Sequence, residues 1–336
     1  MACAGYPGAN REGPSAQRAA DQTQPDRTAR NRCVVRSALV ISDTARVAIG
    51  WPQEAAPMND HFGGTAMSTP KTPLGPAEVY DAHFVPALFA QWGPVVAAEA
   101  SVGAGDHVLD VACGTGALTL AVASIVGPTG SVVGLDANPQ MLAVARRKDA
   151  RAEWLEGAAE ALPLPDDSFD AVVSQFGLMF FRDRPQAMRE MMRVLKPGGR
   201  LAVAVCDSVE NSPGYNAFAQ LLDRLFGREV GDAFRAPFVL GDVEKLRDIC
   251  NDAGIANAQI LQRNGRVRFN SIGALVSTER ACAWTLGGVL TDEQFAQLLK
   301  ESQVVLQPFV TDGAIVEFDM PALIISARKA RQPALP

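Results

Sequence analysis

The chain has few of the residues that build metal sites and disulfide frameworks. Only three histidines occur in 336 residues, and the six cysteines form no C-x-x-C pair. A structural zinc site, a disulfide scaffold and imidazole-based metal chemistry are therefore not expected, and scattered thiols fit a reducing cytoplasm. The cysteines are Cys3, Cys33, Cys113, Cys206, Cys250 and Cys282.

Positive charge and long apolar runs are scarce as well. The formal net charge is -6, which gives no general attraction to nucleic acid or to anionic membranes. No apolar run reaches the length that spans a bilayer. We expect a cytoplasmic protein with a small-molecule partner, no nucleic-acid partner and no membrane span; the sequence leaves the oligomeric state open.

The remaining composition is that of a globular protein preceded by a different N-terminal segment. The hydrophobic fraction is 48% and the charged fraction 20%, enough for a sizeable core. Residues 1–70 show little sustained periodicity and are predicted to be a disordered tail. An organellar transit peptide, or a native start at Met58 or Met67, is the alternative for this segment.

One stretch, from His107 to Gly116, organises the rest of the chain. A short apolar run contains Asp110 near its end, then reaches Gly114 and Gly116, and an amphipathic segment follows. This pattern predicts a buried strand that turns tightly into a helix, leaving backbone N–H groups at the helix N-terminus for a ligand. The glycines suit a sharp turn and close approach of a ligand, and Asp110 faces the crevice at the strand's carboxyl end.

Strand and helix patterns alternate from residue 106 to residue 206, which predicts an α/β fold with a doubly wound, mostly parallel, seven-stranded (Rossmann-like) sheet, helices on both faces and an inserted lid. Residues 76–330 form the predicted domain, with 76–206 as its cofactor-binding core and 207–241 and 266–311 as lid segments. Strands are expected at 108–112, 131–135, 152–155, 169–174, 201–205 and near 258–262, and helices at 117–125, 139–148, 185–195, 217–226, 242–253, 272–287 and 292–306. Residues 196–199 are expected to be a tight turn and the region of Pro237 a loop, with a late strand or a hairpin at 314–319 and 323–327.

An N-terminal helix is expected over residues 77–100, with a break or a kink at Pro86. Tyr80, Phe84 and Trp92 recur at helical spacing, which fits core packing. Alternatively the helix covers the crevice as a lid, with Tyr80 facing the ligand.

The sign of the charge before the glycines separates two kinds of ligand. A glycine turn followed about twenty residues later by Asp136 would fit a dinucleotide site, but here the third glycine is missing. Asp110 would repel a pyrophosphate and attract a cationic amine. A ligand with an amine and ribose hydroxyls but no phosphate is favoured, and S-adenosylmethionine fits that description.

Four motifs resemble those of class I S-adenosylmethionine-dependent methyltransferases. The segment from Val108 to Gly116 resembles their first motif, and that from Gly134 to Met141 resembles the acidic end of their second strand. Residues 157–170 and 193–201 are similar to the subgroup that includes quinone-biosynthesis (UbiE-like) C-methyltransferases and other small-molecule methyltransferases. The match is continuous over residues 76–206 and looser beyond.

This resemblance implies a role for each matching position. Asp110, Ala112, Gly114, Gly116 and Gln175 would surround the methionine part. Asp136 would bind the ribose hydroxyls, and Tyr80 would cover the cofactor. Met141 or Asn138 would flank the adenine, and the backbone at Ala158 and Ala159 would lie at the adenine edge. Many relatives carry Asp at the position of Ala158, so that contact is lost here or moves to Glu160, which otherwise is a solvated acid at a helix start.

Methyl transfer asks little of acids and bases, because an in-line displacement at a sulfonium carbon expels a neutral thioether and depends on positioning. If the acceptor must lose a proton, His83 and Asp207 are the candidate bases. His83 otherwise is a surface residue, and Cys206 is interpreted as a buried apolar residue rather than a nucleophile. No metal ligand set is expected.

The sequence therefore predicts methyl transfer from S-adenosylmethionine to a small, apolar or aromatic acceptor. An apolar lining is suggested by a set of residues that core packing would explain equally well: Phe176, Met179, Phe180, Phe181, Tyr215 and Phe218. An NAD(P)-dependent oxidoreductase and a non-catalytic cofactor-binding protein are the alternatives.

Overall fold

A seven-stranded sheet lies at the centre of the structure, a computed structural model that describes residues 74–148 and 151–331. The strand order is β3-β2-β1-β4-β5-β9-β6, in which β1 to β5 run parallel and β9 runs antiparallel to both of its neighbours. This confirms the predicted fold class. The strands are β1 His107–Val111, β2 Ser131–Asp136, β3 Glu153–Glu156, β4 Phe169–Gln175, β5 Leu195–Cys206, β6 Gln259–Arg263 and β9 Ala322–Arg328.

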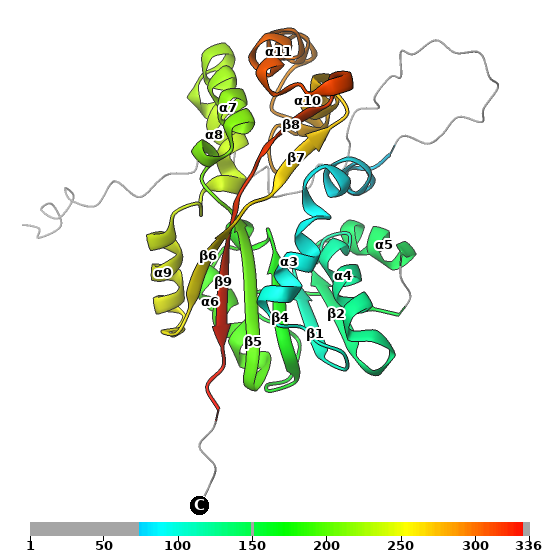
Figure 1. The fold of residues 1–336 in the computed structure, drawn as a ribbon, viewed down its shortest axis with the longest axis vertical. Helices are drawn as coiled ribbons and strands as arrows, with labels where there is room; N and C mark the ends of the chain where they lie inside the picture. The colour runs from blue at the N-terminus through cyan, green and yellow to red at the C-terminus, as the bar shows by residue number, and fades with distance from the viewer. Residues whose placement is uncertain (1–73, 149–150, 332–336) are drawn as a thin grey trace, which may run out of the picture. The chain divides into compact units, whose positions relative to one another are not determined.

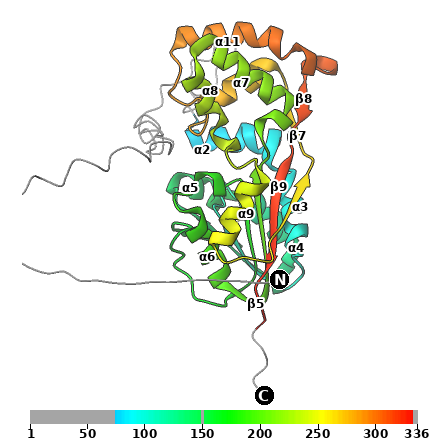
Figure 2. The same cartoon turned by 90° about the vertical axis from the view of Figure 1, so that its left-hand side faces the viewer.

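Helices cover both faces of this sheet. Helices α3 (Trp92–Glu99) and α4 (Ala117–Val126) pack on one face, and α6 (Arg184–Val194) and α9 (Val243–Asp252) on the other (Figure 2). Helix α5 (Pro139–Lys148) packs along β2 and β3. Because the central strands are covered on both sides, they are mostly apolar, and residues 201–205 of β5 are completely buried.

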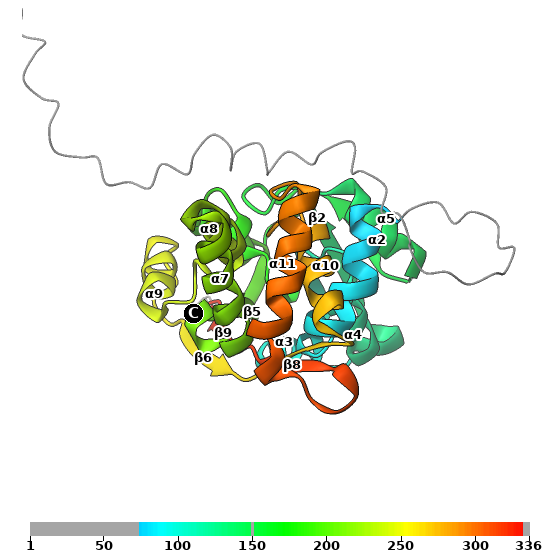
Figure 3. The ribbon, with the colours of Figure 1, turned by 90° about the horizontal axis from the view of Figure 1, so that it is seen from above.

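A second layer, which we call the cap, lies above the carboxyl ends of the strands (Figures 1 and 3). It consists of α7 (Pro213–Phe226), α8 (Arg228–Arg235), α10 (Ile272–Ala281), α11 (Asp292–Val305), β7 (Arg266–Phe269) and β8 (Val316–Asp319). Aromatic residues hold it together: Tyr215 packs edge-on against Phe234, Phe238 and Phe318, with ring centroids 5.0–5.9 Å apart. The burial of Tyr215 and Phe218 at 2% and 0% exposure follows from this packing.

The N-terminal segment differs from the predicted helix in where it breaks. Helix α2 (Pro76–Val79) continues into a π-helix, η1 (Tyr80–Phe89), which passes through Pro86 without a break. In the wider π-turn the N–H of Ala90 donates to the carbonyl of Val85 at 2.8 Å. A proline has no N–H to donate and crowds the preceding turn of an α-helix, and the wider turn relieves both problems. The chain bends only at residues 90–91, before α3.

The turn expected at residues 196–199 is instead part of β5, so this prediction was wrong. The C-terminal chain beyond β9 pairs with it: the Gly198 N–H donates to the Lys329 carbonyl at 3.0 Å, and the Lys329 N–H to the Gly199 carbonyl at 2.9 Å. Gly198 has a φ of +83°, and the pairing of β5 with β4 shifts register after Phe169. A bulged strand therefore replaces the isolated turn.

Three other boundaries need correction. The loop expected around Pro237 is α8 followed by a short 3-10 helix, because Arg235 pairs with Asp223 of α7 at 2.6 Å and Phe234 is buried in the cap. Helix α10 ends at residue 281 rather than 287. Strands β8 and β9 form no hairpin, since β8 pairs with β7 and β9 enters the main sheet.

The short helices connect these elements, and some predictions fall outside the described residues. The short helices are η2 Gly127–Thr129, η3 Leu178–Phe180, η4 Val209–Asn211, η5 Ala236–Phe238, η6 Gln307–Phe309 and η7 Asp312–Ala314. The predicted tail over residues 1–70 and the alternative starts at Met58 and Met67 lie outside the described residues.

Candidate functional site

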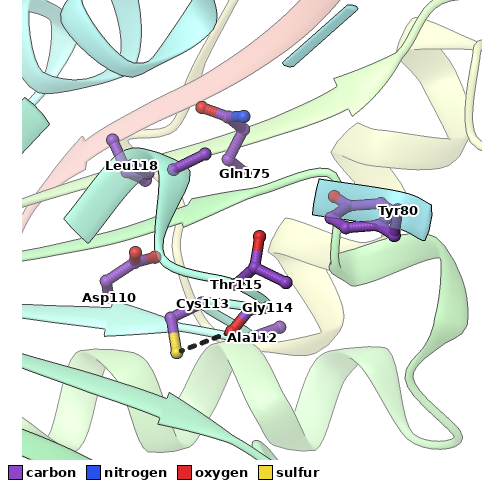
Figure 4. A pocket seen from close by; sticks show the side chains of 9 residues that line it. Tyr80, Asp110, Ala112, Cys113, Gly114, Thr115, Leu118 and Gln175 are labelled. Carbon is purple, nitrogen blue, oxygen red and sulfur yellow. Dashed lines mark hydrogen bonds between the residues drawn. The ribbon is translucent and has the colours of Figure 1, made fainter. Parts of the chain in front are cut away.

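The order of strands reverses between β1 and β4, and a small polar cavity lies where these two strands end. In open α/β sheets such a switch point leaves a crevice outside the carboxyl ends of the strands. Asp110 comes from β1 and Gln175 from β4, and both line the cavity (Figure 4). The complete lining is Tyr80, Asp110, Ala112, Cys113, Gly114, Thr115, Ala117, Leu118 and Gln175.

The loop from β1 into α4 owes its shape to three residues in the left-handed region. Ala112, Gly114 and Gly116 have φ values of +59°, +55° and +87°. For the two glycines this conformation costs nothing, whereas the Cβ of Ala112 makes it strained. Phe176, which follows β4, has a φ of +55° as well, so strained non-glycine residues follow both strands of the switch point.

The two glycines do different things. A Cβ on Gly114 would point into the cavity, 4.0 Å from the Tyr80 ring, so the missing side chain leaves room for a ligand. A Cβ on Gly116 would lie 2.6 Å from the Trp154 ring, which places Gly116 in helix–sheet packing. The sequence predicted that both would approach the ligand, and the structure brings only Gly114 to the cavity.

Three buried oxygen atoms at the cavity have no hydrogen-bond partner among the described residues. They are Oδ1 of Asp110, Oγ1 of Thr115 and Oε1 of Gln175. Buried polar atoms are nearly always paired, because leaving one unpaired costs about 1–3 kcal/mol. The Asp110 and Gln175 oxygens can accept hydrogen bonds, and the Thr115 hydroxyl can accept or donate one. A bound molecule with several N–H or O–H groups would supply the missing partners.

Asp110 is the most strongly perturbed acid of the cavity. It is completely buried, and its other oxygen, Oδ2, accepts from the Thr119 hydroxyl at 2.6 Å. Burial raises the pKa of the Asp110 carboxyl to about 7, although the Thr119 hydroxyl lowers it. No Lys or Arg is among the residues that line the cavity, so a cationic group of a ligand would be the partner of this carboxylate.

Asp136 lies at the end of β2 and holds the loop from the other side. Its Oδ2 accepts from the Gly114 N–H and its Oδ1 from the Asn138 N–H, both at 2.8 Å. Each carboxylate oxygen has two lone pairs, so each keeps one for a ligand hydroxyl. Burial raises the pKa of Asp136, and these backbone N–H groups lower it.

Tyr80 closes the cavity from above as part of an aromatic cluster. Its ring centroid lies 5.4 Å from that of Phe89, 6.0 Å from that of Phe84 and 5.6 Å from that of Trp284 in the segment after α10. Phe89 in turn packs against Phe176 at 5.5 Å. The cavity that remains is about 20 Å³, counted over the positions that a water centre can take, which is room for a single water molecule.

The other predicted cofactor residues lie beside this cavity or away from it. Met141 is buried against Ala77 and Val144, next to Tyr80 and Trp284. Ala158 is exposed and Ala159 buried, and neither lines the cavity. The Glu160 carboxylate accepts from the Arg182 backbone N–H at 2.9 Å, so it already has a partner.

The structure does not bring the two candidate bases to the cavity. His83 is exposed on η1. Asp207 is buried, but its carboxylate accepts from the Ser208 N–H, from Asn211 Nδ2 and from Gln262 Nε2 at 2.5–3.0 Å. It therefore holds together the start of the segment after β5.

Sequence reasoning missed Thr115, Thr119 and, in the cap, Glu279. Thr115 lies within the first motif and Thr119 follows it, but only the folded structure shows which atoms each faces. Glu279 had a visible signal, because it falls on the apolar face of its helix, three and four residues after Val276 and Leu275. Among the described residues no cluster of metal-binding side chains and no helix long and apolar enough to cross a membrane is found.

Comparisons with known proteins identify one methyltransferase family. A model of the ubiE/COQ5 methyltransferase family matches residues 87–265, more than half of the chain. A demethylmenaquinone methyltransferase of Listeria welshimeri is 35% identical over 202 residues, which cover 55% of this chain and 85% of that protein. A ubiquinone/menaquinone biosynthesis C-methyltransferase UbiE of Cronobacter sakazakii is 35% identical over 192 residues, 52% of this chain and 73% of that protein.

A solved structure supports the fold. It is named a methyltransferase from an antibiotic biosynthesis pathway of Anabaena variabilis, and it shares a TM-score of 0.54 at 14% identity, covering 70% of this chain and 96% of that one. The resemblance inferred from the four sequence motifs is confirmed by the family match. The match ends at residue 265, so α10, α11, β7, β8 and β9 lie outside it.

Proposed function

The chain belongs to the ubiE/COQ5 methyltransferase family, and on that premise we propose that it methylates a small aromatic acceptor held between the sheet and the cap. It is an S-adenosylmethionine-dependent methyltransferase, and the relatives named above support neither the oxidoreductase nor the non-catalytic alternative. The observation that carries the proposal is the juxtaposition of unpartnered oxygens at the switch point with an aromatic wall from η1, β4 and the cap.

The residues of the cavity fit S-adenosylmethionine chemically. Asp110 Oδ1 and Gln175 Oε1 would accept from the cationic amine, and the space left by Gly114 would take the amino-acid backbone. The free lone pairs of Asp136 would accept from the ribose hydroxyls. A pyrophosphate would instead place negative charge beside a buried carboxylate that has no cation to neutralise it.

Met141, one of the residues proposed to hold the adenine, lies beside Tyr80. Met141 and the Ala158–Ala159 backbone are proposed for the adenine side, although they do not line the present cavity. A cavity of about 20 Å³ is far below the several hundred Å³ of ordinary ligand sites. We therefore expect Tyr80 and Trp284 to separate when the cofactor enters and to close again over it.

The reaction needs positioning and exclusion of water more than acid or base groups. S-adenosylmethionine supplies an electrophilic methyl group on a sulfonium. Phe89 and Phe176 come from η1 and from the loop after β4, and their rings would hold the acceptor beside the cavity mouth. The cap, made from segments on both sides of β6, would be the substrate lid that keeps water out.

The proposal is tested by following S-adenosylhomocysteine release with two acceptors of different chemistry. The names of the relatives place them in quinone biosynthesis, so 1,4-naphthalenediol, a reduced quinone, serves as the aromatic acceptor and glycine as a small polar one. We expect turnover with the diol and none above background with glycine. Turnover with glycine but not with the diol would contradict an aromatic acceptor.

A further inference from the structure

The cap carries one carboxylate in a place where the sequence pattern calls for an apolar side chain. Helix α10 buries Ile272, Leu275 and Val276, and Glu279 continues that face. Its exposure is 2%. It makes no ion pair with any described residue, whereas its neighbour Arg280 pairs with Asp292.

A second buried polar group, the Tyr215 hydroxyl, lies beside the Glu279 carboxyl and lowers its pKa. Oε2 of Glu279 and the hydroxyl of Tyr215, on α7, are both buried, and neither has a hydrogen-bond partner among the described residues. The two groups lie near enough that each shifts the pKa of the other. Tyr215 is itself only 2% exposed.

The groups that surround this pair are nearly all uncharged. Burial raises the pKa of the Cys206 thiol, at the end of β5, and of the Cys282 thiol, after α10, to about 12, and the charge of Glu279 raises both as well. The Thr285 hydroxyl donates to the Glu279 and Cys282 carbonyls at 3.0 and 3.5 Å. Burial raises the pKa of the Glu279 carboxyl to about 7, while Tyr215 and Thr285 lower it.

The pair lies next to the cofactor cavity. Cys206 and Cys282, which neighbour Glu279, also lie near the Tyr80 hydroxyl. Trp284, five residues after Glu279, packs on the Tyr80 ring at 5.6 Å, and α10 contacts both α2 and η1. The pair therefore sits where sheet, N-terminal segment and cap meet.

The Tyr215 ring packs in the cap, but the Glu279 carboxylate costs stability. A buried carboxyl with no cation and an unpaired oxygen is destabilising, and an apolar residue would pack on α10 more favourably. Local rules of this kind are broken mostly at functional sites. Tyr215 lies inside the family match, which ends at residue 265, and Glu279 lies beyond it.

We propose that Glu279 and Tyr215 together bind an ionisable hydroxyl group on the aromatic acceptor, with Tyr215 donating to its oxygen and Glu279 taking its proton. This rests on the proposed methylation of an aromatic acceptor and assigns two residues to its hydroxyl group. Tyr215 and Glu279 come from α7 and α10, so the packing of these two cap helices positions the pair.

The proton balance is simple. The acceptor O–H bond breaks and its proton moves to Oε2 of Glu279, while the electron pair stays on the acceptor. Through the oxygen or a conjugated ring carbon, that pair forms the new bond to the methyl carbon, and the pair of the broken S–C bond goes to sulfur. After attack at carbon, the ring proton replaces the one lost from oxygen. Either way one proton is left per turnover, and it leaves for water when the cap opens.

Binding tests the proposal without turnover. The probes are 1,4-naphthalenediol and 1,4-dimethoxynaphthalene, which has no proton to give, titrated calorimetrically in the presence of S-adenosylhomocysteine at pH 8. We expect wild type to prefer the diol by about tenfold to a hundredfold, as for hydrogen bonds to charged groups. Glu279→Gln should remove most of this preference and Tyr215→Phe part of it.

The matched control is Glu317→Gln, a cap carboxylate that pairs with Arg266 at the surface, and it should keep the preference. An unchanged preference in Glu279→Gln would overturn the proposal.

Kinetics supply a second readout. Glu279→Gln should lower kcat about a hundredfold or more with an unchanged Kd for S-adenosylmethionine. We expect the kcat of wild type to rise with pH, and this rise should be absent in the variant. A kcat within threefold of wild type would overturn the role as a base. If wild type binds S-adenosylmethionine but does not methylate the diol, the proposed acceptor is wrong, and the binding comparison still decides the role of Glu279.

Discussion

Replacing Asp110 by asparagine should weaken cofactor binding and change stability in opposite directions at two pH values. Asp110 is completely buried, and one of its oxygens has no partner. An interaction between this carboxylate and a cationic amine is a charge-assisted hydrogen bond, worth about 1.5–3 kcal/mol. We therefore expect Asp110→Asn to raise the Kd for S-adenosylmethionine about tenfold to a hundredfold.

The stability change follows from the pKa. Burial raises the pKa of Asp110 from 3.8 to about 7 in the folded protein, so the unfolded chain loses this proton at lower pH than the folded one. Folding stability is therefore lost as the pH rises from about 4 to about 7, by about 4 kcal/mol at 1.36 kcal/mol per pKa unit. Asparagine cannot ionise, so the variant does not lose this stability.

The variant also has a cost that is independent of pH. The amide of asparagine places an N–H group where no acceptor lies, which costs about 1–3 kcal/mol. Combined with the titration, Asp110→Asn should be less stable than wild type near pH 4 and about 1–3 kcal/mol more stable at pH 8.

Urea unfolding of both proteins at the two pH values measures this, and calorimetric titration with S-adenosylmethionine measures the Kd. Wild-type affinity should also rise with pH up to about 7 and then level off. A stability difference that is the same at both pH values, or an unchanged Kd, would refute the reasoning.

Three further substitutions separate binding from packing. Gly114→Ala fills the space below Tyr80 and should weaken S-adenosylmethionine binding about tenfold, while its positive φ costs only about 1 kcal/mol of stability. A calorimetric Kd equal to that of wild type would contradict the role of this space in cofactor binding. Gly116→Ala brings a Cβ 2.6 Å from the Trp154 ring and should lower the free energy of unfolding in urea by about 1–3 kcal/mol; an unchanged urea midpoint would be the contrary result. His83→Ala removes an exposed side chain and should leave the rate of S-adenosylhomocysteine release within about twofold of wild type, so that a hundredfold loss would restore His83 as a base.

The cofactor half of the fold was predictable because local signals and tertiary structure agree there. The apolar run ending near Asp110, the glycine turn and the helix after it specify one strand–turn–helix unit, and the predicted helix over residues 139–148 has the observed bounds. Asp136 also lies where the motif places it, with Gly114 as its partner.

The predictions for the cap and the sheet edge failed because the structure there depends on pairing partners that are far away in the sequence. Lys196 to Gly199 have the composition of a turn, yet pairing with Lys329 makes them part of β5. Whether β8 and β9 form a hairpin is decided by β5, β6 and β7, and no local pattern contains that information.

At the site, residue types were predictable and atom-level roles were not. The sequence treated Gly114 and Gly116 alike, but only one has open space beside its Cα. The sequence offered Asp207 as a candidate base, whereas the structure shows its carboxylate accepting hydrogen bonds from three donors. Hydrogen-bond accounting of this kind requires the folded chain.

The most direct test of the central claim follows the methyl group itself. Wild-type protein is incubated with 1,4-naphthalenediol and with S-adenosylmethionine that carries a ¹³C-labelled methyl group. The products are analysed by NMR and mass spectrometry. The account predicts a labelled methyl group on the naphthalene product, formed in equal amount with S-adenosylhomocysteine. Tight binding of S-adenosylmethionine with the label remaining entirely on it would contradict the account.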